Sequence, residues 1–212
     1  MSIRIQKKSV KSPTRSRIPF YDAAVTYALD RLERELPINL YYHNLWHTRN
    51  EVIPISTFLA VKSGLGEEST NLVRIASAFH DLGISIRYNG HEQISSEIAY
   101  QVLPAYGFSP DQISSVIGMI MATRLPQTPY NLLEQIVADA DLDVLGRSDF
   151  WQRNILLRQE REVYCCTVEE LTWYSQQLNF LEGHHYFTLA AKILRDDGQR
   201  GNIQRIKAHL AC

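Results

Sequence analysis

Helical spacing of apolar residues, from Pro19 to the end of the chain, is the feature that most constrains the fold. Residues 19–37 place their apolar side chains on one helical stripe, and Pro37 follows the end of that stripe. Comparable patterns cover nearly all of the remaining chain, and no stretch alternates apolar and polar residues as a half-buried strand would. The sequence therefore predicts an all-α fold, a single helical bundle of about nine or ten helices over residues 19–212.

Two places in this pattern carry signals that a helix is interrupted. Pro54 lies inside the helical stretch 44–64 and predicts a kink or a break there. Near the C-terminus, glycines separate two apolar stretches, so we expect one helix over about 186–195 and a short final helix over 201–210.

Composition and charge narrow the class of protein. The chain has 212 residues, 45% of them hydrophobic, which is enough to bury a core without disulfides. The net charge of -1 gives no general attraction to nucleic acid or to a membrane, and no apolar run approaches the roughly 18 residues of a membrane span. The three cysteines, two of them the neighbours Cys165 and Cys166, form no disulfide framework. We expect a cytoplasmic protein whose partner is a small molecule, with neither a membrane nor nucleic acid as partner; a homodimer is left open.

The first 18 residues differ from the rest of the chain. Residues 1–18 contain six basic residues and no acidic one, together with several serines and Pro13. This composition predicts a basic, flexible N-terminal arm. A docking arm for an acidic partner is the alternative interpretation, and no further feature of the sequence supports it.

Three clusters of histidine and aspartate interrupt the otherwise apolar helices. They are His43 with His47, His80 with Asp81, and Asp139 with Asp141 and Asp143. A single histidine in an apolar segment is usually a hydrogen-bonded core residue, but three such clusters are harder to explain in that way. Imidazole nitrogen and carboxylate oxygen together form a ligand set for divalent metals, so the clusters predict a metal site.

The order of these clusters resembles the HD superfamily of metal-dependent phosphohydrolases. The family pattern is a histidine, then a His-Asp pair, then an aspartate well downstream. The segments that carry the resemblance are YHNLWH (42–47), AFHDLG (78–83), HEQISSEIA (91–99) and VADADLDVLG (137–146). The resemblance spans residues 40–146 and implies an HD-type helical bundle with a divalent metal ion, which could be Mn, Mg, Fe, Co, Ni or Zn.

The resemblance also implies which residues hold the metal. His47, His80 and Asp81 match the first three ligands of the family. The fourth ligand is an aspartate that follows an alanine, a description that fits both Asp141 and Asp139. We prefer Asp141, and Asp139 remains the alternative.

Other residues match catalytic or substrate-binding positions of the family. His43 corresponds to the general acid of related phosphodiesterases, and Asp81 is expected to contact the attacking water as well as the metal. His91 and Glu92 could complete a second metal site or bind substrate. Arg124 stands where some relatives have a histidine, which weakens a two-metal site and offers a guanidinium for a phosphate.

Arg87, in the irregular segment 82–90, is a second phosphate-binding candidate. Together these features predict a metal-dependent phosphohydrolase that acts on a nucleotide or another small phosphate ester through a metal-activated water. Two alternatives remain, a di-iron HD-type oxygenase, which needs two metals, and a non-catalytic HD signalling module.

Overall fold

The structure is a computed structural model, and it describes residues 19–211. This part of the chain forms nine α-helices: α1 (Tyr21–Glu35), α2 (Ile53–Lys62), α3 (Glu67–Phe79), α4 (His91–Val102), α5 (Pro110–Ala122), α6 (Leu132–Asp141), α7 (Phe150–Tyr164), α8 (Glu170–Gly183) and α9 (Leu189–Leu210). Residues 19–211 contain no strand, so the predicted all-α bundle is confirmed. None of these helices is both long enough and apolar enough to cross a bilayer. The basic segment 1–18, predicted as an arm, lies outside the described residues.

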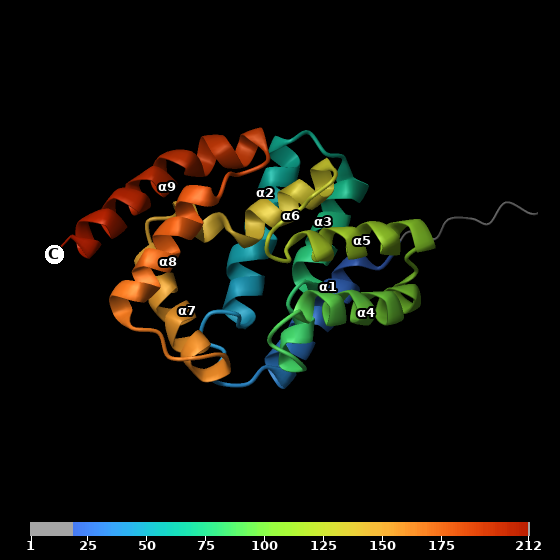
Figure 1. Ribbon diagram of the computed structural model, residues 1–212. Coiled ribbons are helices and arrows are strands. Elements are labelled where there is room, and N and C mark those ends of the chain that lie inside the picture. The colour runs from blue at the N-terminus through green and yellow to red at the C-terminus, as the bar shows by residue number, and fades with distance from the viewer. Residues whose placement is uncertain (1–18, 212) are drawn as a thin grey trace, which may run out of the picture.

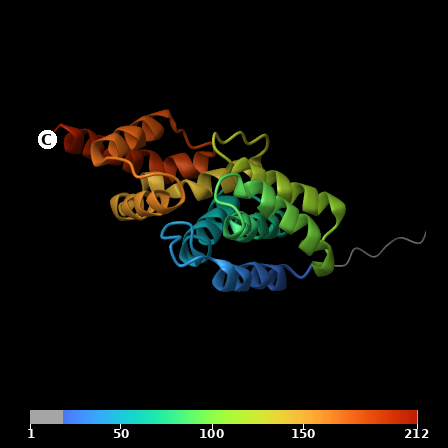
Figure 2. The same cartoon turned by 60° about the horizontal axis from the view of Figure 1, so that its bottom comes forward.

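The helices bury two hydrophobic clusters. The larger cluster lies among α1 to α6 and includes Phe79, Ile120 and Ile136. The smaller one joins α7, α8 and α9 around Trp173 and Phe150. Figures 1 and 2 show α7 to α9 together on one side of the molecule, with α1, α3, α4 and α5 on the other and α2 and α6 between them. The predicted site residues lie where these two halves meet.

The helical stretch with Pro54 changes helix type and does not break. Residues His47–Val52 form π-helical turns that continue directly into α2, in which Pro54 is the second residue. Proline lacks an N–H group and its ring crowds the preceding turn of an α-helix, and a wider turn accommodates both effects. This change of helix type takes the place of the predicted kink or break, and it occurs at His47, the first ligand candidate.

The two helices predicted near the C-terminus are one, because α9 runs without interruption through Gly198 and Gly201. A Cβ atom at Gly198 would lie 2.0 Å from the carbonyl oxygen of Gly146. Gly146 ends the 3₁₀ turn Asp143–Gly146, which packs against α9. The glycine therefore permits close packing of α9 on this turn, and the prediction that it separates two helices is wrong.

Candidate metal centre

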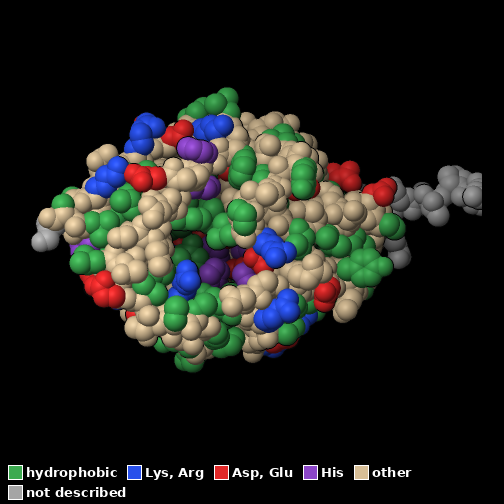
Figure 3. Space-filling model, in the orientation of Figure 1, with side chains coloured by type: hydrophobic (Ala, Val, Ile, Leu, Met, Phe, Trp, Pro, Cys, Tyr) green, Lys and Arg blue, Asp and Glu red, His purple; other side chains and the backbone are tan. Residues whose placement is uncertain are grey.

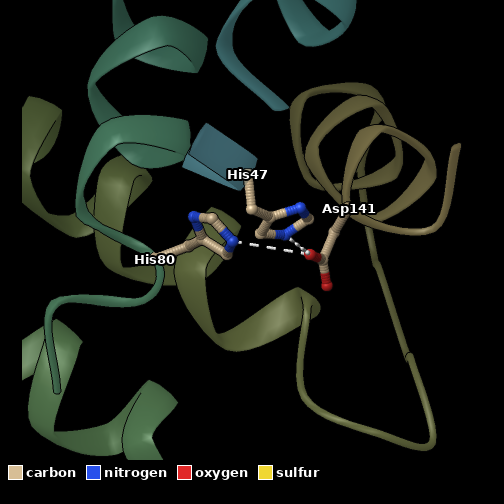
Figure 4. A group of neighbouring side chains, drawn as sticks. All are labelled: His47, His80 and Asp141. Carbon is tan, nitrogen blue, oxygen red and sulfur yellow. Dashed lines mark hydrogen bonds and ion pairs between the residues drawn. The ribbon is translucent and has the colours of Figure 1, made fainter. Parts of the chain in front are cut away.

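Three of the predicted ligands converge from three different helical segments. Nε2 of His47 lies 3.3 Å from Oδ1 of Asp141, and Nε2 of His80 lies 3.4 Å from the same oxygen. Figure 4 shows the three side chains pointing toward one another. Among residues 19–211 this is the one group of three or more His, Cys, Asp or Glu residues whose ligand atoms all lie within 4.8 Å of one another.

Asp81 adds a second carboxylate to this group. Its Oδ2 lies 3.2 Å from Nε2 of His80 and 3.9 Å from Nε2 of His47. Ligand atoms about 2.1 Å from a common cation stand roughly 3–3.5 Å apart, so most of these spacings suit a single ion. Nε2 of His80 and Oδ2 of Asp81 are both buried, and neither has a hydrogen-bond partner in the described chain. Buried polar atoms are rarely left unpaired, so the residues present fit a bound divalent metal.

Hydrogen bonds on the far side of both imidazole rings direct Nε2 into the centre. Nδ1–H of His47 donates to Oε2 of Glu51 over 3.0 Å, and Nδ1–H of His80 donates to the carbonyl oxygen of Ser77 over 2.8 Å. Each bond fixes a proton on Nδ1, so Nε2 is the nitrogen that can bind a metal once its own proton is displaced.

The electrostatics of the centre favour a cation. Burial lowers the pKa of His80, but the carboxylates of Asp81 and Asp141 raise it well above the usual value for histidine. Burial raises the pKa of Asp81, yet His80 and His91 bring it well below the usual value. Burial likewise acts to raise the pKa of Asp141, and the two imidazoles beside it bring the pKa below the usual range. Two buried carboxylates are thus held ionised by positive charge on the imidazoles, a role that a divalent ion would take over.

The two other aspartates of the third cluster point elsewhere. Asp139 accepts hydrogen bonds from the backbone N–H groups of Phe187 and Thr188, both over 2.8 Å, and from the Thr188 hydroxyl over 2.7 Å. Asp143 forms an ion pair with Arg195 of α9. The geometry thus brings Asp141 into the metal group and uses Asp139 to hold the segment that leads into α9.

His91 reaches the centre from the N-terminus of α4. Its Nε2 lies 3.1 Å from Oδ1 of Asp81, and its Nδ1–H donates to the carbonyl oxygen of Tyr88 over 2.8 Å. Gly83 makes this approach possible, because a Cβ there would lie 2.2 Å from the backbone oxygen of His91. Glu92 is buried beside it, and its Oε2 has no hydrogen-bond partner among the described residues.

His43 is oriented by a carboxylate from the other half of the molecule. Glu160 of α7 is fully buried, and it accepts a short hydrogen bond from Nδ1–H of His43. Glu160 also accepts from the backbone N–H groups of Tyr42 and His43 and from the Tyr88 hydroxyl. Burial acts to raise the pKa of Glu160, but these donors outweigh it and the pKa lies below the usual value. The spacing of His43 and His47 predicted that the two share a helix face. This prediction is wrong, because His43 precedes the helix, although the two rings lie 6.0 Å apart.

A cavity of about 330 Å³ opens onto the centre. Its wall contains five of the predicted site residues, namely His43, Asp81, His91, Glu92 and Asp141. Figure 3 shows the opening, with histidine and acidic side chains at its depth and basic side chains near its rim. The rest of the wall is mostly apolar and is lined by residues such as Leu142, Val144, Phe150, Leu157 and Phe180.

The arginine in the wall of the cavity is Arg161, which the sequence did not single out. Its guanidinium lies over the ring of Trp173, 5.7 Å from the ring centre, and no carboxylate of residues 19–211 forms an ion pair with it. The two predicted phosphate-binding arginines do not line the cavity. Arg124 is exposed just after α5, and Arg87 donates to the carbonyl oxygen of Gly90 over 3.1 Å.

Sequence reasoning missed three residues of the site. Glu51 could have been found, because it follows the first ligand candidate by four residues; it is held by Arg147 and Arg153, each at 2.9 Å. Glu160 and Arg161 lie more than a hundred residues from that segment, in a helix whose charges resemble those of any solvated helix face. No local signal marks them.

The same fold occurs in solved structures, although no protein-family model and no curated protein sequence matches the chain. A predicted HD superfamily hydrolase from an uncultured Thermotogales bacterium is 19% identical, with a TM-score of 0.59, over 93% of this chain and 95% of its own. Bacillus subtilis YpgQ, in complex with ADP, is 17% identical, with a TM-score of 0.64, over 89% of this chain and 92% of its own. A Lactobacillus plantarum protein is 17% identical, with a TM-score of 0.63, over 90% of this chain and 96% of its own. These likenesses show the fold, and the HD-type bundle that the sequence resemblance implied is confirmed at that level.

Proposed function

We propose that this protein is a metal-dependent phosphohydrolase that acts on a nucleotide or another small phosphate ester. The observation that carries the proposal is the convergence of unpartnered His80 Nε2 and Asp81 Oδ2 with His47 and Asp141 beside an open cavity. The shared fold with a predicted HD superfamily hydrolase supports hydrolysis. The shared fold with a protein in complex with ADP supports a nucleotide.

Four residues would hold the metal, His47, His80, Asp81 and Asp141. A divalent ion in such a site lowers the pKa of bound water and polarises a phosphoryl group. This ligand set accepts several ions, among them Mn, Fe, Co, Ni and Zn. The hydrogen bonds from Nδ1 of both histidines already point Nε2 into the site, so an ion would displace the Nε2 protons with little movement of the rings.

The other residues of the site have distinct tasks in this reaction. His43 donates a proton from Nε2 to the leaving oxygen, because Glu160 engages its Nδ1 and fixes the plane of the ring. Asp81 orients the attacking water, and His91 holds the other oxygen of that carboxylate in place. Arg161 neutralises charge on the phosphate, the task that the sequence had suggested for Arg124 and Arg87.

The proposal is tested by metal removal and phosphate release. Protein treated with chelator should release no phosphate from a panel of nucleotides and sugar phosphates, and Mn, Mg, Co or Ni should restore release for some of them. His80→Ala should lose both metal binding and activity, whereas His185→Ala, an exposed histidine, should retain both. Full activity of chelated protein, or of His80→Ala, would overturn the proposal.

One observation favours a second candidate, a di-iron oxygenase. Asp81 presents its other oxygen to His91, and the neighbouring Glu92 has an unpartnered buried oxygen, so both could contribute to a second ion. Against this, residues 19–211 contain one complete group of three ligands. Two irons per chain with an iron absorption band would favour the oxygenase, and one ion per chain the hydrolase. Failure to bind any divalent metal would favour a signalling module.

A further inference from the structure

Three hydrogen-bonded side chains from α7 and α8 form a chain that ends at the cavity. Nε1–H of Trp173 donates to Oδ1 of Asn154 over 2.7 Å, and Nδ2–H of Asn154 donates to Oε1 of Gln177 over 2.7 Å. All three side chains are buried, with Trp173 fully so. Asn154 and Gln177 both line the cavity.

The chemistry of the indole determines the orientation of both amides. An indole N–H can only donate, so the Asn154 atom that faces Trp173 must be its oxygen. The NH₂ group of Asn154 then faces Gln177, so the Gln177 atom that receives it must also be an oxygen. Because the assignment starts from the indole N–H of Trp173, it fixes which end of each amide is oxygen and which is nitrogen. The remaining group of Gln177 is its NH₂, which has no acceptor among the described residues.

The surroundings of Gln177 show which part of a substrate it meets. The neighbouring wall is formed by apolar side chains, including Phe150, Leu157 and Phe180, and Gln177 itself is 8% exposed. A phosphate would meet the metal ligands and Arg161, whereas this wall suits the organic part of an ester. In such a wall a single oriented donor discriminates strongly, because a mismatched polar group stays unpaired and buried.

We propose that Gln177 binds the organic part of the substrate as an obligatory hydrogen-bond donor. It selects esters that present a carbonyl oxygen at this position over esters of the same shape that present an amino group. The inference rests on the proposed function for its phosphate ester, but the recognition itself requires neither metal nor turnover.

Nucleotide pairs that differ by one carbonyl or amino group provide the test. Inosine and adenosine 5′-monophosphates form one pair, and uridine and cytidine 5′-monophosphates form the other. For at least one pair we expect the wild-type protein to favour the carbonyl member about tenfold in kcat/KM, the value of one neutral hydrogen bond. Gln177→Leu should bring this ratio close to one. Gln177→Glu places an acceptor in the cavity and should reverse the preference.

A second variant tests the relay without changing Gln177. Asn154→Asp still accepts from Trp173 but offers Gln177 an oxygen in place of NH₂. Gln177 should then turn, donate to that oxygen and present its own oxygen to the cavity, so the preference should shift toward the amino member. A purely structural role for Asn154 would lower activity on both members equally. Gln176→Leu, an exposed neighbour on α8, is the matched control and should keep the wild-type ratio.

A binding measurement separates this inference from the proposed function. Affinities of metal-free protein for the four parent nucleosides, measured by ligand-observed NMR, should follow the same order and change in the same way in the variants. That pattern without phosphate release would refute the hydrolase and keep the role of Gln177. Phosphate release with equal ratios in wild-type and folded Gln177 variants would keep the hydrolase and overturn the role of Gln177.

Discussion

Replacing Asp139 and Asp141 separately should have opposite consequences, although the two residues are almost adjacent and both follow an alanine. Asp139→Ala removes three hydrogen bonds to a carboxylate and leaves the backbone N–H groups of Phe187 and Thr188 without a partner. Each such loss costs about 1–3 kcal/mol. Burial raises the pKa of Asp139, so the free-energy cost of desolvating the carboxylate offsets part of the stabilisation from these bonds. We therefore expect a net loss of about 3 kcal/mol in the free energy of unfolding.

Asp141→Ala should change stability little when no metal is bound. Oδ1 of Asp141 lies 3.3 Å from Nε2 of His47 and 3.4 Å from Nε2 of His80, both long contacts, and after its removal both imidazoles still face the carboxylate of Asp81. Because the Asp141 side chain is 19% exposed, the expected loss is about 1 kcal/mol, which is smaller than the loss for Asp139→Ala. The variant should, however, lose the stabilisation that a bound metal provides, which is about 2.7 kcal/mol at a metal concentration of 100 times Kd.

Urea unfolding in chelator and in Mn²⁺ distinguishes these effects. Asp139→Ala should unfold at lower urea in both conditions and keep the difference between them, whereas Asp141→Ala should resemble wild type in chelator and show no difference. If Asp139→Ala has a greatly reduced stability, Asp139→Asn keeps one acceptor and serves as a milder variant. A loss of the metal-dependent difference in the Asp139 variants, with retention in Asp141→Ala, would refute the assignment.

Three further predictions follow from individual contacts. Glu160→Gln removes the negative charge that orients His43, so kcat for phosphate release should fall about 10- to 100-fold. The affinity for Mn²⁺, measured by calorimetry, should not change, and a loss of affinity would contradict this role of Glu160. Burial, with the nearby charge of His185, lowers the pKa of His184 to about 4, so the folded protein binds fewer protons than the unfolded chain between about pH 4 and 6.5. Stability contributed by neutral His184 is complete above this window and lost as pH falls through it, and His184→Gln should flatten the dependence of urea unfolding on pH; an unchanged slope would exclude this cause. Gly83→Ala should lose about 2–3 kcal/mol, because its Cβ would lie 2.2 Å from a backbone oxygen, whereas Gly66→Ala, with no atom within 4 Å of its Cβ, should change the unfolding midpoint little.

Local sequence patterns were sufficient for most of the helices and for the residues that converge on the metal centre. Helical periodicity depends on near neighbours, and the clusters around His47, His80 and Asp141 are visible as polar interruptions in apolar segments. The helix break predicted near Gly198 was wrong because the role of this glycine depends on a residue that is distant in sequence. Gly198 permits the close approach of Gly146, which lies 52 residues away in the chain, and no local pattern reveals that contact.

The same limit explains why Glu160 and Arg161, which lie at or beside the cavity, were missed. Glu160 serves the catalytic histidine candidate from 117 residues away, and only the burial of its carboxylate separates it from an ordinary helix charge. Arg124 was chosen because some relatives have a histidine there, and Arg87 because it lies in the segment that follows the His-Asp pair. Arg161 lines the cavity because α7 packs against the first half of the molecule. Neither criterion reports how the helices pack, and the packing decides which arginine lines the cavity.

The division of the site between two halves of the chain has a consequence for how its chemistry can change. All four candidate metal ligands lie in residues 47–141, whereas Arg161 and Gln177 come from α7 and α8. Glu160 connects the halves, because it binds the backbone of Tyr42 and the ring of His43 from α7. Substitutions in α8 can therefore alter which ester fits without disturbing the metal. Changes at Glu160 would not leave the chemistry intact, because this one carboxylate positions His43, the proposed general acid.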